Sequence, residues 1–250
     1  MDLDNKTVVI TGAGQGIGQI IAVTLIKSGA RVALLDIGDL SATEKTCKML
    51  SGEVKSYHCD VTDEDEVDAT FAAIGRDFGS IDVLVNNAGI LKDGMLVKRR
   101  EGDTQVLGYD QFRDVMNVNV NGTFLCGRAA AKQMVERGVG GVIVNISSVS
   151  RAGNIGQTNY SASKAAVAAM TVVWAKELGR YGIRVGAIAP GVVETAMTDA
   201  MKPEAKERLT ALVPVGKMAS AAEIAEGVCF VIHNEYFSGR VLELDGGLRL

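Results

Sequence analysis

The chain has 250 residues, of which 47% are hydrophobic and 22% are charged. These proportions match globular proteins, at roughly 45–50% and about 25%, and exclude a disordered or fibrous chain. The 26 basic and 30 acidic residues give a net charge of −4, so the chain lacks the positive field that holds a nucleic-acid backbone. We therefore expect no nucleic-acid partner.

Short β-branched runs alternate with longer segments of helical period along the chain. This alternation predicts an α/β fold with a doubly wound parallel sheet, and the continuously apolar strands predict helices on both faces. Without a visible linker or repeat, we predict one domain over residues 1–250, with a cofactor half of about 1–147 and a catalytic and substrate half of about 148–250. The seven expected strands are Thr7–Ile10, Arg31–Leu35, Val54–Cys59, Val83–Asn86, Gly141–Ile146, Arg184–Ile188 and Arg240–Leu244, and the expected helices include Gly18–Ser28, Asp63–Phe78, Gly122–Arg137, Asn159–Tyr181 and Ala221–His233.

The first strand leads into a glycine-rich turn, Thr11–Gly18, and then into a helix. Glycine lets the backbone approach a ligand closely, and the start of a helix attracts a pyrophosphate. The spacing departs from G-x-G-x-x-G, because that template would end on Ile17 or Gln19. In its strand–turn–helix setting the turn still predicts a dinucleotide-binding loop, with a purely structural turn as the alternative.

Asp36 ends the second strand, 18 residues beyond Gly18 and near the ~20-residue offset at which an acidic residue meets the adenosine ribose. Its carboxylate can accept both ribose hydroxyls and would repel a 2′-phosphate. No arginine lies in the glycine turn or directly after Asp36. We therefore predict that the chain binds NAD(H) in preference to NADP(H). Alternatively, Asp36 only begins a solvated loop.

Two segments, Leu91–Gly108 and Thr195–Met218, show no clear period. Loops at the carboxyl ends of strands bind ligands in α/β sheets, so both segments are candidate substrate walls. The first contains Lys98-Arg99-Arg100, which either attracts an acidic or phosphorylated carrier or forms a solvated face.

Motifs spread over the whole chain carry a resemblance to a known family. They are Thr11–Gly18, Asp60-Val61, Asn86–Gly89, Asn119, Ser148, Tyr160-x-x-x-Lys164, Pro190-Gly191 and Asp245–Gly247. In this order and at these distances the sequence resembles the short-chain dehydrogenase/reductase family. The resemblance implies a Rossmann-like sheet of strand order 3-2-1-4-5-6-7 with its site at the carboxyl edge.

The resemblance also implies four catalytic residues. Tyr160 exchanges a proton with the substrate oxygen, Lys164 lowers the pKa of that tyrosine and holds the nicotinamide ribose, and Ser148 donates a hydrogen bond to the same oxygen. Asn119 positions a water that connects Lys164 to solvent, or else forms only local bonds. The spacing agrees, because Tyr160 and Lys164 share a helix face and a nearby ammonium favours the phenolate.

Three serines, Ser147, Ser148 and Ser150, lie near the expected catalytic position. Alternation along the strand places Ser147 and Ser148 on opposite faces, so only one can face the nicotinamide. We choose Ser148, which aligns with the second serine of the family's N-x-S-S, although its distance of 12 residues from Tyr160 is one shorter than usual.

The cofactor contacts follow from the same resemblance. It places Gly12, Gln15, Gly16, Ile17 and Gly18 at the pyrophosphate, Asp36 and Ile37 at the ribose, Asp60 and Val61 beside adenine, Asn87, Ala88 and Gly89 along the middle of the cofactor, and Pro190, Gly191, Val193 and Thr195 towards the nicotinamide. Asp60 is alternatively a structural residue at a helix start. The four scattered cysteines and two isolated histidines predict no disulfide scaffold and no metal site.

Within the family, Gly89–Asp93 and Asn154–Tyr160 look most like 3-oxoacyl-thioester reductases. Two features depart from those NADPH-preferring enzymes: Gln15 stands where they carry arginine, and Leu91–Gly108 is longer. We therefore expect an NAD-dependent dehydrogenase of a secondary alcohol/ketone pair, with a thioester reductase as the alternative. A dinucleotide-binding sensor without turnover is less favoured.

The expected partners are a small-molecule substrate and further copies of the chain. The Asn159–Tyr181 helix and the Asp245–Leu250 segment resemble the interface elements of family members, which are commonly tetramers. The polar first residues, Met1–Lys6, are unlike a signal peptide, and the longest apolar stretch is shorter than the ~18 residues of a membrane span. We expect a cytoplasmic protein without a membrane partner.

Overall fold

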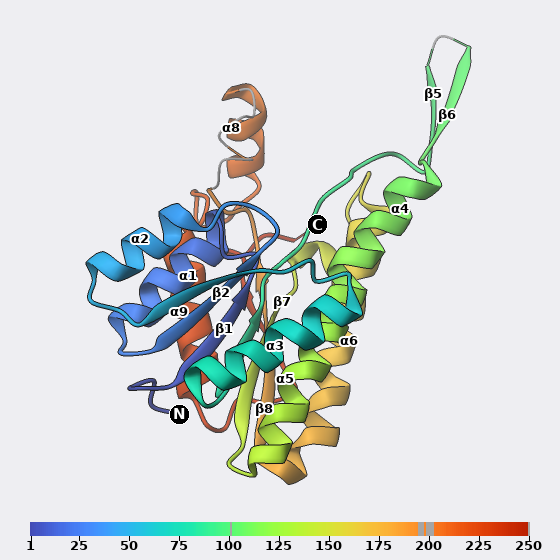
Figure 1. Cartoon of the computed structure of the whole chain (residues 1–250). Coiled ribbons are helices and arrows are strands. Elements are labelled where there is room, and N and C mark those ends of the chain that lie inside the picture. The colour runs from blue at the N-terminus through green and yellow to red at the C-terminus, as the bar shows by residue number, and fades with distance from the viewer. Residues whose placement is uncertain (101, 195–197, 199–202, 250) are drawn as a thin grey trace.

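The computed structural model describes residues 1–100, 102–194, 198 and 203–249. Seven parallel strands form a central sheet in the order β3-β2-β1-β4-β7-β8-β9 (Figure 1). The strands are β1 (Thr7–Thr11), β2 (Arg31–Asp36), β3 (Val54–His58), β4 (Val83–Asn86), β7 (Gly141–Ile146), β8 (Ile183–Pro190) and β9 (Val241–Leu244). Each lies within two residues of its expected bounds, so the predicted α/β class and strand order are confirmed.

Helices cover both faces of this sheet (Figure 1). On one face lie α1 (Gly16–Lys27), α2 (Ser41–Met49) and α9 (Ala221–His233), and on the other lie α3 (Glu64–Phe78), α5 (Thr123–Arg137) and α6 (Thr158–Leu178), which continues into a short 3₁₀ turn, Gly179–Tyr181. Local signals set the helix ends. Asp63 caps α3 by accepting a hydrogen bond from the Glu66 N–H (2.9 Å), and Gly79 ends it in the left-handed region at φ +76°.

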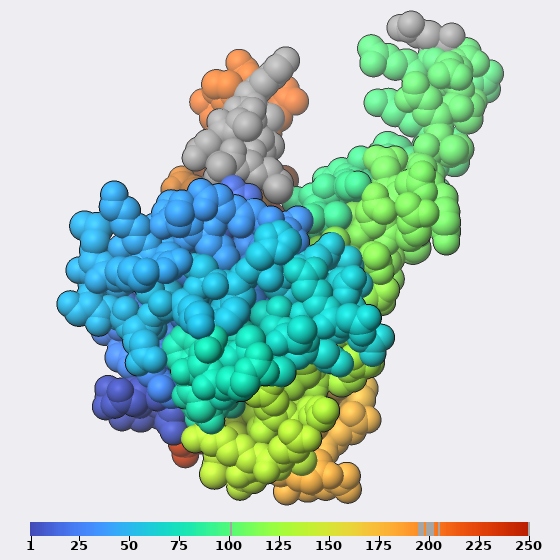
Figure 2. Space-filling model, viewed as in Figure 1, coloured from blue at the N-terminus to red at the C-terminus, as the bar shows by residue number. Residues whose placement is uncertain are grey.

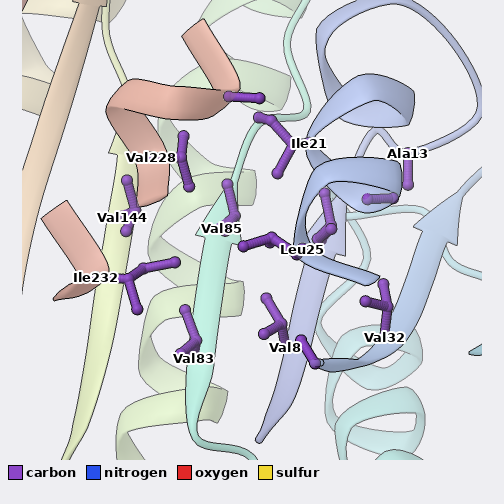
Figure 3. Close-up of a cluster of buried hydrophobic side chains, with 14 of the residues drawn as sticks. Val8, Ala13, Ile21, Leu25, Val32, Val83, Val85, Val144, Val228 and Ile232 are labelled. Atoms are coloured by element: carbon purple, nitrogen blue, oxygen red, sulfur yellow. The ribbon is translucent and has the colours of Figure 1, made fainter. Parts of the chain in front are cut away.

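Apolar side chains fill both spaces between sheet and helices. Figure 3 shows Val8, Val85 and Val144 of the sheet beside Ile21 and Leu25 of α1 and Val228 and Ile232 of α9. On the opposite face, Val9, Leu84 and Ile143 pack with Phe71 and Ile74 of α3 and Leu125 and Ala130 of α5. Burial on both faces explains why the strands are continuously apolar instead of alternating.

A buried polar chain fixes α6 to the centre of the sheet. The Asn86 side-chain amide on β4 donates to the Asn145 side-chain oxygen on β7 (2.9 Å), and the Asn145 amide donates to the Thr171 hydroxyl on α6 (3.0 Å). Buried amides that lose such partners are costly, so this chain restricts where α6 can lie. The first two turns of α6 carry Tyr160 and Lys164, the expected catalytic pair, so the position of α6 matters for the site.

The expectation of two irregular segments is only partly correct. Within Leu91–Gly108 the chain forms an antiparallel hairpin of β5 (Val97–Arg100) and β6 (Asp103–Val106), followed by α4 (Tyr109–Met116). Every described residue of this hairpin, which we call the arm, is exposed, and the arm stands away from the body (Figures 1 and 2). A ribbon that buries neither face gives no apolar period in the sequence.

The second segment, Thr195–Met218, contains the helix α8 (Pro203–Ala211), while residues 195–197 and 199–202 lie outside the described part of the chain. Across the described residues, no helix is long and apolar enough to cross a membrane.

Candidate active site

The turn between β1 and α1 has a shape that requires glycine. Gly12 and Gly16 have φ angles of +65° and +57°, in the left-handed region. A Cβ atom on Gly18 would lie 2.1 Å from the carbonyl oxygen of Gly12, so a side chain there would collide with the backbone of the turn. Gln15 precedes α1 and Ile17 is partly exposed within its first turn. The positive end of α1 therefore opens at the turn, where it can attract an anion.

The end of β4 is tied to this turn by hydrogen bonds. The Thr11 hydroxyl accepts from the backbone N–H groups of Asn87 (3.1 Å) and Ala88 (3.0 Å). The Asn87 side-chain amide donates to the carbonyl oxygens of Thr11 (3.0 Å) and Gly12 (2.9 Å). The Asn87 amide thus holds the glycine turn in place, a role that the sequence comparison with the family did not assign to it.

Asp36 lies at the carboxyl end of β2 beside the same turn. One carboxylate oxygen accepts from the Gly14 N–H and the other from the Gly38 N–H, each at 2.9 Å. A carboxylate has about four acceptor positions, so each oxygen retains capacity for a ligand hydroxyl. Ile37 follows with 65% of its surface exposed. The structure places a fixed negative charge next to the glycine turn.

Asp60 and Val61 follow β3 and are engaged mainly with the chain itself. One Asp60 oxygen accepts from the Thr62 N–H (2.9 Å) and hydroxyl (2.8 Å). Val61 is buried, and a Cβ atom on Gly122 would lie 2.6 Å from its side chain. The Asp60 side chain thus orders the turn that leads into α3, and its contact with adenine stays a prediction.

Tyr160 and Lys164 lie one turn apart on α6. The Lys164 Nζ atom is buried, donates to the Ile146 carbonyl oxygen (2.8 Å) and lies 5.6 Å from the centre of the Tyr160 ring. The Ser148 hydroxyl, at the end of β7, hydrogen-bonds to the Tyr160 phenol. The structure therefore brings together three of the four expected catalytic side chains.

Asn119 lies close to this group within a π-helical turn, Asn117–Gly122. Its side-chain amide donates to the Ile90 carbonyl oxygen (3.1 Å) and the Ser163 hydroxyl (3.0 Å), and its oxygen accepts from the Ile90 N–H (2.8 Å). A Cβ atom on Gly89 would lie 3.2 Å from the Asn119 oxygen and 3.4 Å from Lys164 Nζ. These bonds hold the Asn119 side chain near the Lys164 ammonium, in a π-helical turn of the kind that often occurs at functional sites.

The two adjacent serines have different partners, as their alternation along the strand predicts. Ser147 donates to the Lys164 backbone carbonyl oxygen (2.9 Å), whereas Ser148 contacts the Tyr160 phenol and accepts from the Ser150 N–H (3.1 Å). Ser147 thus supports α6, and Ser148 is the serine placed next to a group that can transfer a proton.

We expect Ser148→Ala to lower kcat by about 10²-fold or more, because the substrate oxygen would lose a positioned donor. Ser147→Ala removes one buried hydrogen bond, costing about 1 kcal/mol of stability, and should retain most of the activity. Steady-state kinetics and thermal unfolding of both variants check this ranking. Greater loss of kcat in Ser147→Ala would reject the choice of Ser148.

Burial affects the pKa values of both Tyr160 and Lys164. Burial raises the pKa of the Tyr160 phenol; the hydrogen bond from Ser148 lowers this pKa, and the nearby Asp93 carboxylate raises it further. Burial also lowers the pKa of Lys164 to about 8, because a desolvated ammonium is unfavourable. Burial therefore favours the neutral phenol, and the lowering of the Tyr160 pKa by the Lys164 ammonium stays a prediction.

The loop after β8 contains the remaining expected contacts. Gly191 lies against Asp245, since a Cβ atom on it would be 2.7 Å from the Asp245 Cα atom. Val193, which follows Pro190-Gly191 by two residues, is buried and pairs with Ala219. Thr195 lies outside the described residues. This loop is thus fixed at its start, where it leaves the sheet.

Asn159 is a site residue that the sequence interpretation missed. It is fully buried, its amide donates to the backbone oxygens of Lys92 (2.8 Å) and Gln111 (3.3 Å), and its oxygen accepts from the Tyr160 N–H (2.8 Å). Asn159 therefore fixes the backbone of Tyr160 relative to Lys92, in the segment before the arm, and to α4. An asparagine at a helix start is a recognisable local signal, but its long-range partners are not.

Comparisons with known proteins agree with this geometry. A family model described as short chain dehydrogenase matches residues 6–206. The chain is 40% identical over 253 residues to the 3-oxoacyl-[acyl-carrier-protein] reductase FabG of Thermotoga maritima, covering 99% of each protein. It is 37% identical over 249 residues to the FabG of Staphylococcus aureus (97% of this chain, 98% of the relative), and 42% identical over 250 residues to an uncharacterized oxidoreductase of Mycobacterium bovis (98% and 97%). The chain belongs to the short-chain dehydrogenase/reductase family.

Proposed function

We propose that this chain is an NAD(H)-dependent oxidoreductase that acts on a secondary alcohol/ketone pair. The contact between Ser148 and Tyr160, with the Lys164 ammonium 5.6 Å from the phenol ring, carries the proposal. A hydroxyl and a phenol side by side can both bond to one substrate oxygen, and the phenol can exchange a proton with it. In this proposal, residues 1–147 hold the cofactor and 148–250 complete the catalytic and substrate half of one domain.

The glycine turn fits a dinucleotide, because Gly12 and Gly16 hold its backbone in the left-handed region and the start of α1 opens at the turn. The pyrophosphate would be held by Gly12, Gln15, Gly16, Ile17 and Gly18, the ribose by Asp36 and Ile37, and the rest of the cofactor by Asp60, Val61, Asn87, Ala88, Gly89, Tyr160, Lys164, Pro190, Gly191, Val193 and Thr195. When bound, the nicotinamide supplies a hydride in reduction or accepts one in oxidation.

The chain's own residues orient the substrate and handle the proton. The neutral Tyr160 phenol, which burial favours, is the form that donates a proton to a carbonyl oxygen during reduction. Ser148 donates a hydrogen bond to the same oxygen and orients it. Lys164, held by the Ile146 carbonyl oxygen, places its charge where it stabilises the resulting phenolate. In oxidation the same proton moves in the opposite direction.

The direct test is turnover with a broad panel of ketones and alcohols in the presence of NADH or NAD, followed by nicotinamide absorbance. The panel should include 3-oxoacyl thioesters with short pantetheine-like carriers. Reduction of several ketones supports the proposal, and cofactor binding without turnover across the whole panel would instead support a sensor.

We predict that the protein binds NADH at least about ten-fold more tightly than NADPH. The Asp36 carboxylate, fixed by the Gly14 and Gly38 N–H groups, can accept ribose hydroxyls and repels a 2′-phosphate, and such like-charge contacts are costly. Fluorescence titration of both reduced cofactors measures the ratio. Comparable affinities for the two would contradict the prediction.

The Asp36→Asn variant should narrow this ratio by weakening NADH binding and relieving the repulsion of NADPH. Asp65→Asn is a matched control, because Asp65 is exposed on the first turn of α3 and its loss removes the same charge. The control should leave the ratio unchanged, which separates the local effect of Asp36 from that of net charge.

A second candidate substrate class is the 3-oxoacyl thioesters. The relatives from Thermotoga maritima and Staphylococcus aureus are named as reductases of such compounds on an acyl carrier protein. The two segments that resemble those reductases, Gly89–Asp93 and Asn154–Tyr160, lie side by side, since the Gly94 N–H donates to the Gly156 carbonyl oxygen (2.8 Å). Faster turnover of thioesters than of simple ketones in the panel would favour this class.

We further propose that the chain forms a homo-oligomer, specifically a tetramer, in which α6 and the 245–250 segment contribute to the interfaces. The outward side of α6 carries Ala162, Ala165, Ala169 and Val173, all exposed and all apolar or small. A helix that is apolar on nearly every side is usually buried against other parts of the protein. The exposed apolar side of α6 therefore supports contact with a second copy of the chain.

A further inference from the structure

Asp93 is held at the start of the arm, directly beside the first turn of α6. Its Oδ2 atom accepts a hydrogen bond from the Gln157 side-chain amide (2.9 Å). The next residue, Gly94, donates from its backbone N–H to the Gly156 carbonyl oxygen (2.8 Å) and pairs with Gln157. Gln157 is the residue that precedes α6, three positions before Tyr160. The carboxylate is therefore fixed beside the residue that leads into the first turn of α6, which contains Tyr160.

The partners of Asp93 are themselves held in place. The Gln157 side-chain oxygen accepts from the Asn154 amide (3.0 Å), so the Gln157 side chain is bonded at both ends. On the other side of Asp93, the Lys92 carbonyl oxygen accepts from the buried Asn159 amide (2.8 Å). A group held on both sides in this way is preorganised, and ordering it on ligand binding costs little.

The charge of Asp93 has no ionic partner among the described residues. The neighbouring Lys92 ammonium is directed to Asp114, with which it forms a 2.7 Å ion pair. Asp93 is exposed, and its second carboxylate oxygen has no hydrogen bond from the described part of the chain. The negative charge of Asp93 nevertheless acts on the Tyr160 phenol. Burial raises the pKa of Tyr160 most, the hydrogen bond with Ser148 lowers it, and the Asp93 charge raises it further.

We propose that Asp93 is a specificity-determining residue that selects uncharged substrates bearing a hydrogen-bond donor, such as an amide N–H or a hydroxyl, and disfavours substrates with a carboxylate near the reacting carbonyl. The free oxygen of Asp93 accepts a hydrogen bond from the donor, and its charge repels a second anion. The inference rests on the proposed oxidoreductase function and names the substrate class of the same site.

The test uses two probes of matched size, 3-oxobutanamide and 3-oxobutanoate. Their dissociation constants are measured on the full chain saturated with NADH, by the change in nicotinamide fluorescence, so the readout does not require turnover. We expect the wild type to bind the amide at least about ten-fold more tightly than the carboxylate, because a unit charge within the site acts through a medium of low effective dielectric. Equal binding, or no measurable binding of the amide, would overturn the proposal.

Asp93→Asn should bring the two dissociation constants to within about two-fold of each other, since an amide neither repels the carboxylate nor favours the donor to the same extent. Asp103→Asn is the matched control: Asp103 is exposed on β6 and also accepts from a glutamine amide, that of Gln105 (3.4 Å), but lies on the arm away from α6. A ratio that falls equally in both variants, or in neither, would reject Asp93 as the selecting residue.

A pH profile separates this role from a merely structural one. Lys164, whose ammonium lies 5.6 Å from the centre of the Tyr160 ring, is unchanged in Asp93→Asn. Lys92, the neighbour of Asp93, is paired with Asp114 and should stay so. Removal of the Asp93 charge should lower the pKa of Tyr160, so the rate of alcohol oxidation should rise at a lower pH than in the wild type. Asp103→Asn should leave this pH profile unchanged. If ketones are reduced but neither the pH profile nor the probe ratio responds to Asp93→Asn, this inference fails while the proposed function stands. Absence of turnover with every substrate would fail the proposed function and, with it, the inference.

Discussion

Replacing Tyr160 with phenylalanine will lower kcat by about 10²–10⁴-fold, the usual contribution of a positioned general acid or base. The variant lacks only the phenolic oxygen, which contacts Ser148. The ring remains next to Lys164, whose Nζ atom keeps its 2.8 Å hydrogen bond to the Ile146 carbonyl oxygen. Binding of NAD(H), measured by fluorescence titration, should therefore change little while the rate followed by nicotinamide absorbance falls.

Tyr181→Phe provides the matched control for this substitution. Tyr181 is 40% exposed on the 3₁₀ turn after α6, and its ring lies 4.7 Å from the Arg180 guanidinium. Its loss of a phenolic oxygen should leave kcat unchanged. Full turnover by Tyr160→Phe would show that another group transfers the proton, and a wild type that binds NAD(H) without turnover would identify a sensor.

The central sheet was predictable because its strands carry a strong burial signal. Val83–Asn86 and Gly141–Ile146 match the observed β4 and β7 at both ends. Each of these strands is buried along its whole length, so its apolar run begins and ends with the strand itself. The order of strands came from the family resemblance, and the structure confirms it.

The arm and α4 were not predictable in the same way because they bury little apolar surface. The four residues of β5 and the four of β6 are all exposed, and Val115 is the single buried residue of α4. An isolated two-stranded hairpin is marginally stable, so sequence period alone gives no reason to place one here. The arm is therefore a feature that only the three-dimensional structure reveals.

The candidate site combines local motifs with contacts between distant parts of the chain. The glycine turn and the four-residue spacing of Tyr160 and Lys164 are visible in the sequence. The bonds from Asn87 to Thr11 and from Asn159 to Lys92 join residues 76 and 67 positions apart, so no local pattern signals them. The raised pKa of Tyr160 also depends on how deeply its side chain is buried, and the sequence alone does not give the burial of a single residue.

At the opposite edge of the sheet from this site, Asp82 joins three elements. Its carboxylate accepts from the Thr7 N–H (2.9 Å) at the start of β1, the Ser80 hydroxyl (3.1 Å) and the Arg137 guanidinium (2.8 Å) at the end of α5. The residue is only 4% exposed. Burial alone would raise the pKa of Asp82, but the Thr7 amide, Arg137 and Ser80 together hold this pKa below its ordinary value.

We expect Asp82→Ala to lower the free energy of unfolding at neutral pH by about 2–4 kcal/mol, because it leaves a buried N–H group without an acceptor and breaks a largely buried ion pair. Urea unfolding of the variant and the wild type measures this difference. Asp77→Ala is the control: that carboxylate pairs with Lys55 (2.6 Å) on the exposed surface, where solvent screens the interaction, so its loss should be much smaller.

The stabilisation by Asp82 should also depend on pH in a defined direction. Because its pKa is lower in the folded chain than the ordinary value of about 3.9, the unfolded chain binds more protons between the two values, and stability rises with pH there. The difference in unfolding free energy between wild type and Asp82→Ala should thus be constant near neutrality and shrink as the pH falls below about 4. Other acid-labile groups contribute equally to both proteins and cancel in this difference. A difference that grows on acidification would mean that the Asp82 carboxylate is not stabilised in the folded state, and that the Thr7 and Arg137 contacts do not offset the cost of its burial.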